Sequence, residues 1–191
     1  MGSVRLAWIV PTIGRQSLVS ALASLHADAF ISDQILVVAD GPRPHARERA
    51  IGTTYIETPS KEKRWGATPR TLGFWAAAAM RCTHIAMLDD DDLWLVGSRV
   101  KIEQDVSAQP DALHLYKMRI RGGQIIWDTP DVAKHNVSTQ MAIFPATPPF
   151  PTWPPVYTGD HAFIAELAKA YPVVWHEKII AMQPDTEATD V

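Results

Sequence analysis

The chain has 191 residues, of which 47% are hydrophobic and 20% charged, and its formal net charge is −3. This composition predicts one soluble domain over residues 1–191, with no long-range field to recruit nucleic acid or an anionic membrane. No stretch predicts a membrane span or a secretory signal, and the lone Cys82 predicts neither a disulfide nor a cysteine-bound metal. We therefore expect a cytoplasmic protein.

The first half of the chain predicts alternating strands and helices. Strands are expected over residues 4–10, 34–39, 53–57 and 84–88, and helices over 17–29, 43–49 and from Pro69 onward. Polar turns follow the first two strands, at residues 11–15 and 40–42. This order is typical of a parallel α/β sheet, whose ligands bind at the carboxyl ends of the strands.

The second half predicts a mixed sheet. Helices are expected over 97–109 and 158–170, and strands over 113–119, 124–127, 137–144 and 173–175, with a hairpin at Gly122-Gly123 that introduces antiparallel pairing. Residues 145–155 hold six prolines and predict a loop, either a lid or a rigid connector. Residues 183–191 are expected to be a flexible tail.

Four consecutive carboxylates, Asp89 to Asp92, follow the apolar run 84–88. Two unit charges about 4 Å apart repel by about 4 kcal/mol at an effective dielectric near 20, so the run requires an offsetting cation. Mg²⁺ or Mn²⁺ would supply it and keep positions open for phosphate oxygens. The alternative is a solvated acidic turn that caps the next helix. A calcium-binding helix-loop-helix is excluded, because the sixth position from Asp89 is Trp94 rather than glycine.

Five segments in order carry a resemblance to a known family. They are Ile-Val-Pro-Thr-Ile-Gly-Arg (9–15), Val-Val-Ala-Asp-Gly (37–41), Gly66 with Arg70 and Gly73, Met-Leu-Asp-Asp-Asp-Asp-Leu-Trp (87–94) and Gly-Asp-His-Ala-Phe-Ile (159–164). Together they resemble a family 2-type glycosyltransferase with the GT-A fold. The resemblance implies a nucleotide-diphospho-sugar transferase-like, Rossmann-like α/β fold, with a mixed, mainly parallel sheet flanked by helices. It also implies a donor-binding half over 1–95 and an acceptor-side half over 96–182.

The resemblance implies metal-dependent, inverting transfer of a sugar from a nucleoside-diphosphate sugar to an acceptor hydroxyl. The implied donor-binding residues are Pro11, Thr12, Arg15, Asp40, Gly66, Arg70, Asp89 and Asp90. The implied ligands of Mn²⁺ or Mg²⁺ are Asp91, Asp89 and His176, and the implied general base is Asp160. If the strand persists through the acidic run, alternation pairs Asp89 with Asp91 on one ligand and leaves Asp92 as a helix cap or supporting group.

Two positions depart from the family pattern: Thr71 stands where asparagine is frequent, and Gly159 stands where a second acid is usual. The plainer alternatives are a turn residue for Asp40, a helix cap for Asp160 and a surface group for His176. The basic residues between Lys61 and Arg70 belong either to a solvated loop or to an anion site.

The donor is expected to be a UDP-sugar, with a GDP-sugar possible, and the acceptor stays open among a glycan, a small molecule and a modified nucleic acid. Its site is expected from residues 137–141, the proline-rich loop and the Asp160 helix, with Trp127, Trp153 and Tyr157 as candidates for stacking on a ring. Two other functions compete: a nucleotidyltransferase that makes a nucleotide sugar, and a non-catalytic nucleotide-sugar binding module. The first would require a Gly-rich, basic phosphate loop after the first strand, which residues 11–16 do not provide.

Overall fold

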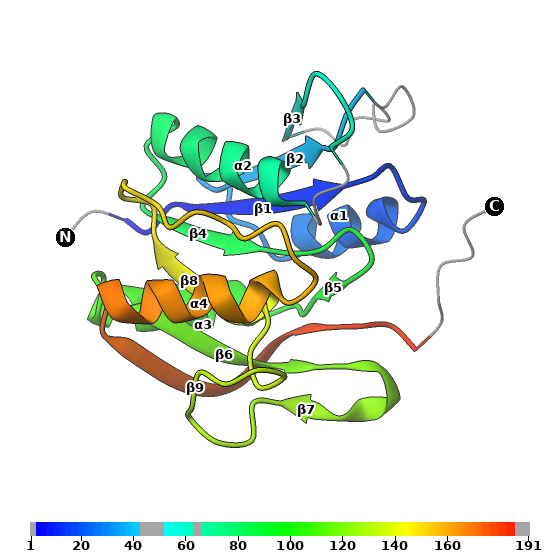
Figure 1. The fold of residues 1–191 in the computed structure, drawn as a ribbon. Coiled ribbons are helices and arrows are strands. Elements are labelled where there is room, and N and C mark those ends of the chain that lie inside the picture. Colours follow the sequence, from blue (N-terminus) through cyan, green and yellow to red (C-terminus); the bar gives the residue numbers. More distant parts are fainter. Residues whose placement is uncertain (1–2, 43–51, 63–65, 186–191) are drawn as a thin grey trace.

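The computed structural model describes residues 3–42, 52–62 and 66–185 (Figure 1). In chain order the elements are β1 (Leu6–Thr12), α1 (Leu18–His26), β2 (Gln34–Ala39), β3 (Thr53–Glu57), α2 (Ala67–Ala79), β4 (His84–Met87), β5 (Leu93–Trp94), α3 (Ser98–Ala108), β6 (Leu113–Arg119), η2 (Arg121–Gly123), β7 (Ile125–Ile126), η3 (Thr139–Met141), β8 (Ala142–Pro145), α4 (Gly159–Ala170) and β9 (Val173–Met182). None of the helices in these ranges has the length and apolar character needed to cross a membrane.

The strands form one mixed sheet in the order β3-β2-β1-β4-β8-β6-β9-β5, with β7 paired to β6. The neighbours β3, β2, β1 and β4 are parallel, whereas β8 runs antiparallel to both β4 and β6. The parallel part therefore brings the carboxyl ends of β1, β2 and β4 to the same edge. The predicted α/β fold, with a mixed and mainly parallel sheet flanked by helices, is confirmed.

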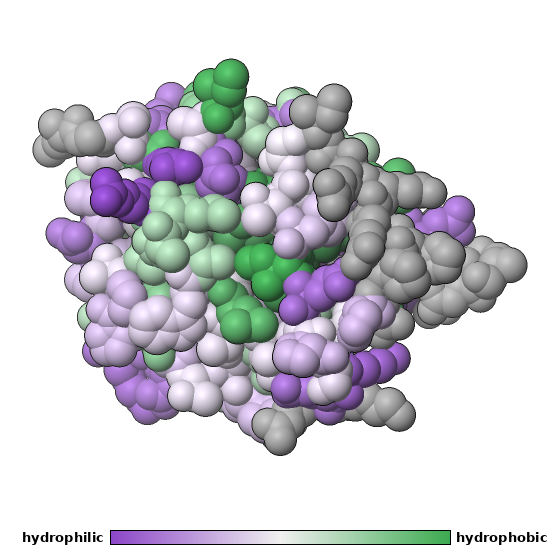
Figure 2. Space-filling model, turned by 90° about the horizontal axis from the view of Figure 1, so that it is seen from above, coloured by the Kyte–Doolittle hydropathy of each residue, from purple (hydrophilic) through white to green (hydrophobic). Residues whose placement is uncertain are grey.

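Helices cover both faces of the sheet. On one face, buried side chains such as Trp8 and Val10 pack with apolar residues of α1 and α3, including Leu22 and Ile102. The opposite face packs with α2 and α4 through an aromatic cluster around Phe74, whose ring stacks on Phe163 at 5.2 Å. Seen from the side on which α2 lies, apolar side chains gather near the middle of the molecule and hydrophilic ones lie mostly toward its rim (Figure 2).

Most predicted elements are present within a few residues of their expected bounds, and three differ in a way that matters for the site. Strand β4 ends at Met87, so the acidic run lies outside the sheet. The strand expected over 137–144 is instead the 3₁₀ turn η3 followed by β8. The last strand continues through His176 to Met182, because β6 and β5 pair with its second half. The helix expected over 43–49 lies outside the described residues.

Two glycines fix the position of α2 and of the arginine it carries. Gly66 precedes the helix with φ +70°, a left-handed conformation that favours glycine. Gly73 lies against β1, where a Cβ atom would come within 2.5 Å of Ile9 Cγ2. The helix therefore approaches the sheet as closely as its backbone allows, and Arg70 lies between the two glycines at the edge where the strands end.

We expect Gly73→Ala to lower the free energy of unfolding by about 1–3 kcal/mol, because the added methyl group overpacks against Ile9. Helix propensity alone would raise the free energy of unfolding, because it favours alanine over glycine by about 1 kcal/mol. Urea denaturation measures the effect. In an Ile9→Ala background Gly73→Ala should cost less, because the side-chain atoms that the added methyl group would meet are absent. A Gly73→Ala variant as stable as the parent protein would show that the close approach of α2 to β1 is wrong.

Candidate functional site

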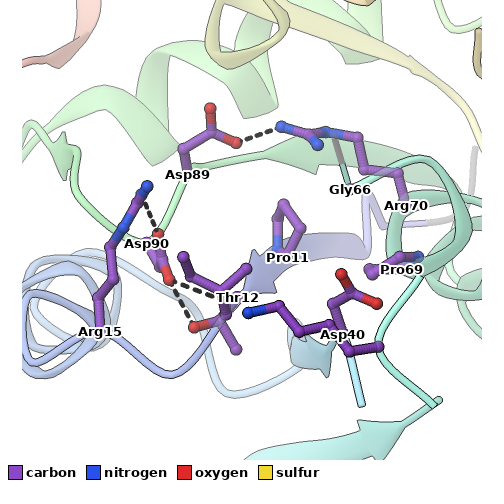
Figure 3. A pocket seen from close by; sticks show the side chains of 11 residues that line it. Pro11, Thr12, Arg15, Asp40, Gly66, Pro69, Arg70, Asp89 and Asp90 are labelled. Atoms are coloured by element: carbon purple, nitrogen blue, oxygen red, sulfur yellow. Dashed lines mark hydrogen bonds and ion pairs between the residues drawn. The ribbon is translucent and has the colours of Figure 1, made fainter. Parts of the chain in front are cut away.

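A pocket of about 430 Å³ opens at the carboxyl ends of β1 and β2, beside the start of α2 (Figure 3). Its lining residues are Pro11, Thr12, Ile13, Arg15, Asp40, Lys61, Gly66, Pro69, Arg70, Asp89 and Asp90. All eight residues expected to bind a donor therefore line this one pocket, although they come from four separate segments of the chain. Ile13, Lys61 and Pro69 are the additional lining residues.

The acidic run forms a turn, in which the Asp92 amide donates to the Asp89 carbonyl at 3.1 Å. A turn brings its first and fourth residues together, and the carboxylates of Asp89 and Asp92 both accept from Gln140 Nε2, at 2.9 and 2.7 Å. Asp90 and Asp91 instead share Arg15. The strand alternation from which the pairing of Asp89 with Asp91 was expected is absent, because β4 ends at Met87 and the acidic run forms a turn.

Arg15 bridges the two middle carboxylates of the turn. Its Nη1 lies 3.0 Å from Asp90 Oδ1 and 3.1 Å from Asp91 Oδ2. The other oxygen of Asp90 accepts from Thr12 Oγ1 at 2.5 Å and from the Ile13 amide at 3.3 Å. These contacts fix the buried Asp90 carboxylate from two sides, both of them formed by the end of β1 and the loop after it. The Asp91 side chain, in contrast, remains 36% exposed.

Arg70 is held in the pocket by two contacts and by the space that Gly66 leaves for it. Its Nη2 lies 2.5 Å from Asp89 Oδ1, and its guanidinium lies 4.5 Å from the ring centre of Trp153. On a third side Gly66 leaves space for it, since a Cβ there would come within 2.3 Å of Arg70 Nη1. An arginine with a fixed plane next to a pocket is suited to bind phosphate oxygens in a bidentate manner.

The proline-rich loop is anchored at the residue that contacts Arg70. Trp153 is 2% exposed and packs against Phe163 of α4, with ring centres 4.7 Å apart. This packing is what a rigid connector requires. Of the other aromatic candidates, Trp127 is buried against Trp175 and is not free to stack on a ligand, whereas Tyr157 is exposed.

Burial changes the protonation of the acidic turn. Desolvation raises the pKa of Asp92 to about 8, and the negative charge of Asp89 adds to the rise. Asp92 is therefore mostly protonated at neutral pH. Desolvation also raises the pKa of Asp89, which the Arg70 guanidinium counteracts and the charge of Asp160 reinforces.

Two arginines, one amide and the proton on Asp92 therefore offset the repulsion within the run. We tested whether the same residues fit a divalent cation. Carboxylate oxygens are suitable ligands for Mg²⁺ or Mn²⁺. However, no group of three ligating side chains converges anywhere in residues 3–42, 52–62 and 66–185. The side chains present therefore do not by themselves form a complete metal centre.

Asp160 lies in the first turn of α4, near the acidic turn. Its Oδ2 accepts from Ser138 Oγ at 3.1 Å, from the Thr139 amide at 3.3 Å and from Thr139 Oγ1 at 3.2 Å. The preceding Gly159 has no space for a larger side chain, because a Cβ atom would come within 2.9 Å of both Trp153 Nε1 and the Pro154 carbonyl. The indole of Trp153 thus explains why glycine replaces the acid expected there.

Asp40 lines the pocket and also organises it. Its Oδ1 accepts from the Glu62 amide at 2.9 Å, and Gly41 donates to Thr58 Oγ1 at 2.6 Å, so the turn after β2 and the segment after β3 are tied together. Asp40 therefore has the hydrogen bonds expected of a turn residue, and it also lines the pocket.

His176 does not join the aspartates. It lies in the middle of β9, where Nε2 is 2.9 Å from His114 Nδ1 and Nδ1 is 3.3 Å from Asp105 Oδ2. Its ring stacks on Tyr116 with centres 4.4 Å apart. Both ring nitrogens therefore have partners away from the pocket. The expectation placed His176 at the end of a short strand, but the strand is longer and directs the side chain toward α3.

Sequence reasoning missed the role of Gln140. The segment 137–141 was expected at the acceptor side, yet no motif marks a glutamine as a partner of two aspartates. Its function in the site depends on η3 lying over the acidic turn, which only the tertiary structure reveals.

The histidine cluster predicts loss of stability in acid. Burial lowers the pKa of His176 to about 4, below its ordinary value of 6.5. Between these values the unfolded chain binds a proton that the folded chain does not, so stability falls as pH falls through this window. Between pH 7 and 5 we expect the parent to lose about 2 kcal/mol more than His176→Gln, measured by urea denaturation at each pH. Equal losses in both proteins would contradict a buried neutral His176.

Comparisons with known proteins show what the fold is similar to. The sequence matches no protein-family model and no curated protein. Solved structures of TarS from S. aureus do match in three dimensions. One comprises TarS residues 1–349, with a TM-score of 0.74, 14% sequence identity, and coverage of 94% of this chain and 60% of that chain.

Two further structures of the same TarS segment contain nucleotides. The complex with UDP has a TM-score of 0.70 at 13% identity and covers 94% of this chain, and the complex with UDP-GlcNAc has a TM-score of 0.70 at 14% identity and covers 97%. Each match spans 60% of the TarS segment. The chain therefore has the fold of TarS 1–349 over nearly its whole length and corresponds to little more than half of that segment.

Proposed function

We propose that this chain is a glycosyltransferase that moves a sugar from a nucleoside-diphosphate sugar, preferably a UDP-sugar, to an acceptor hydroxyl. One observation carries the proposal. The eight residues expected to bind a donor, scattered between Pro11 and Asp90, line a single pocket at the carboxyl ends of parallel strands. The TarS structures that contain UDP and UDP-GlcNAc, on the same fold, support a uridine nucleotide as the donor.

The pocket has the charges that a nucleoside diphosphate requires. Arg15 and Arg70 line the pocket from opposite sides, and Lys61 contributes a third cationic side chain to the lining (Figure 3). Guanidinium groups match phosphate oxygens in geometry and stabilise the charge that develops on a leaving diphosphate. The Asp40 carboxylate would accept a hydrogen bond from a base edge. We therefore place the diphosphate between the two arginines and the base beside Asp40.

Asp160 is the proposed general base. It would take the proton of an acceptor hydroxyl while that oxygen forms a bond to the anomeric carbon. The bond from this carbon to the diphosphate breaks, and the nucleoside diphosphate leaves with the electron pair. A single displacement of this kind inverts the anomeric centre. Asp160 is suited to the role because it lies in the first turn of α4, where the amide and hydroxyl of Thr139 and the hydroxyl of Ser138 orient its carboxyl group.

Mg²⁺ or Mn²⁺ remains a proposed cofactor. Asp91 is the most accessible member of the acidic turn, and with Asp89 it would supply carboxylate oxygens. The remaining ligands would have to be diphosphate oxygens and water, which is how Mg²⁺ commonly binds in nucleotide sites. When bound, the ion would add positive charge at the leaving diphosphate.

The two competing functions make different demands on the same pocket. A nucleotidyltransferase would use UTP and a sugar phosphate and release pyrophosphate. A binding module would hold UDP-GlcNAc without releasing UDP. Incubation of the protein with each substrate set, followed by detection of UDP and pyrophosphate, distinguishes all three.

We expect UDP to bind the parent protein and Arg70→Met to weaken binding about 10- to 100-fold, because one charge-assisted phosphate contact is lost. Isothermal titration calorimetry measures both dissociation constants. Arg119→Met, which changes an exposed arginine at the end of β6, is the matched control and should bind like the parent. Absence of UDP binding by the parent would reject the proposed function.

The same titration with Mn²⁺ present and absent tests the cofactor. We expect Mn²⁺ to tighten UDP binding and Asp91→Asn to abolish this gain. An equal affinity with and without the ion would reject the metal requirement and leave the nucleotide site in place.

Asp160→Asn separates binding from chemistry. We expect it to keep the UDP affinity of the parent and to slow the release of UDP from UDP-GlcNAc, with water as the acceptor, by about 100- to 10,000-fold. The asparagine is isosteric and preserves the turn of α4. Unchanged turnover would show that Asp160 is only a helix residue.

A further inference from the structure

Gln140 is a buried polar side chain next to the donor pocket that none of the preceding roles uses. It lies in η3, is 2% exposed and does not line the pocket. Its Nε2 donates to Asp89 Oδ2 at 2.9 Å and to Asp92 Oδ2 at 2.7 Å. An amide nitrogen has two hydrogens, so these two bonds use its whole capacity as a donor.

The orientation of this amide is fixed. Gln140 Oε1 lies beside Ser138 Oγ, whose single proton goes either to this oxygen or to Asp160 Oδ2. The other end of the amide sets its orientation, because an exchange of its oxygen and nitrogen would place a carbonyl against the Asp89 carboxylate. The amide also carries no formal charge. It therefore holds the two ends of the acidic turn together and adds no positive charge that would itself attract a diphosphate.

The same turn of chain holds the candidate base. Ser138 and Thr139, the two residues before Gln140, surround Asp160 Oδ2 with the three polar groups described above, of which the Thr139 amide and hydroxyl donate to it independently of Gln140. Three consecutive residues thus hold Asp89 and Asp92 on one side and Asp160 on the other. On its pocket side Asp89 is held by Arg70, so the chain of contacts runs from the donor pocket through Gln140 to Asp160.

We propose that Gln140 is a positioning residue that sets the place of Asp160 relative to the donor, by tying η3 to the acidic turn. The inference rests on the proposed function. Gln140 acts through Asp89, Ser138 and Thr139. A displacement of about 1 Å between a base and its substrate slows a reaction about 100-fold. Gln140 does not line the pocket, so its replacement should leave nucleotide binding unchanged.

The test measures kcat and KM for release of UDP from UDP-GlcNAc, with water as the acceptor, together with the dissociation constant of UDP. We expect Gln140→Leu to lower kcat about 10- to 100-fold and to leave KM and the UDP dissociation constant within about twofold of the parent. Gln140→Glu, which keeps the shape and replaces the donor by a third carboxylate, should have the same effect and guards against misfolding of the leucine variant. Gln104→Leu, at an exposed position of α3, is the matched control.

A double-mutant cycle with Asp160→Asn identifies the route of the effect. If Gln140 acts through Asp160, Gln140→Leu should lower kcat little further in the Asp160→Asn background. Three results would each overturn the inference. They are an unchanged kcat in both Gln140 variants, a loss of UDP affinity as large as the loss of kcat, and losses of kcat that are fully additive in the double variant. Failure of the parent protein to bind UDP is a separate result, which rejects the proposed function itself.

Discussion

Four carboxylates in consecutive positions, Asp89 to Asp92, begin two residues after the end of the buried strand β4, and the site is arranged around the repulsion between them. Left without partners, neighbouring charges of this kind cost several kcal/mol at the edge of a low-dielectric core. The structure offsets this cost in three ways. Arg15 and Arg70 each bind carboxylates of the run, Gln140 donates to two of them, and burial keeps Asp92 mostly protonated at neutral pH.

This arrangement accounts for the positions of segments that are distant in sequence. The loop after β1 supplies Arg15, the first turn of α2 supplies Arg70, and η3 supplies Gln140. Each approaches the acidic turn because it neutralises or orients part of it. The pocket is lined by Arg15 and Arg70 but not by Gln140, and Lys61 is its third cationic lining residue. A catalytic function of the proposed kind uses the same charges that stabilise the turn.

The sequence was informative where function follows from local pattern. Polar turns after apolar runs located the strand ends, and since parallel strands end at one edge, the residues proposed to bind the donor lie together in one pocket. The sequence predicted side-chain partners less well where the direction of a side chain depends on the exact length of its strand. Strand β4 ends one residue earlier than expected, which changes the pairing of Asp89, and β9 is seven residues longer, which engages His176 elsewhere. Gln140 has no local signature, because a neutral amide becomes a structural partner only when tertiary contacts bury it against carboxylates.

The central claim is that the pocket between Arg70 and Asp40 binds the nucleotide of a sugar donor, with the reacting centre directed toward Asp160. A crystal structure of the protein with UDP-GlcNAc tests it most directly. The account predicts the diphosphate within hydrogen-bond distance of the Arg70 guanidinium, the uracil beside Asp40 and the sugar on the side of Asp160. A nucleotide bound outside this pocket, or an empty pocket in crystals grown with saturating UDP-GlcNAc, would contradict it.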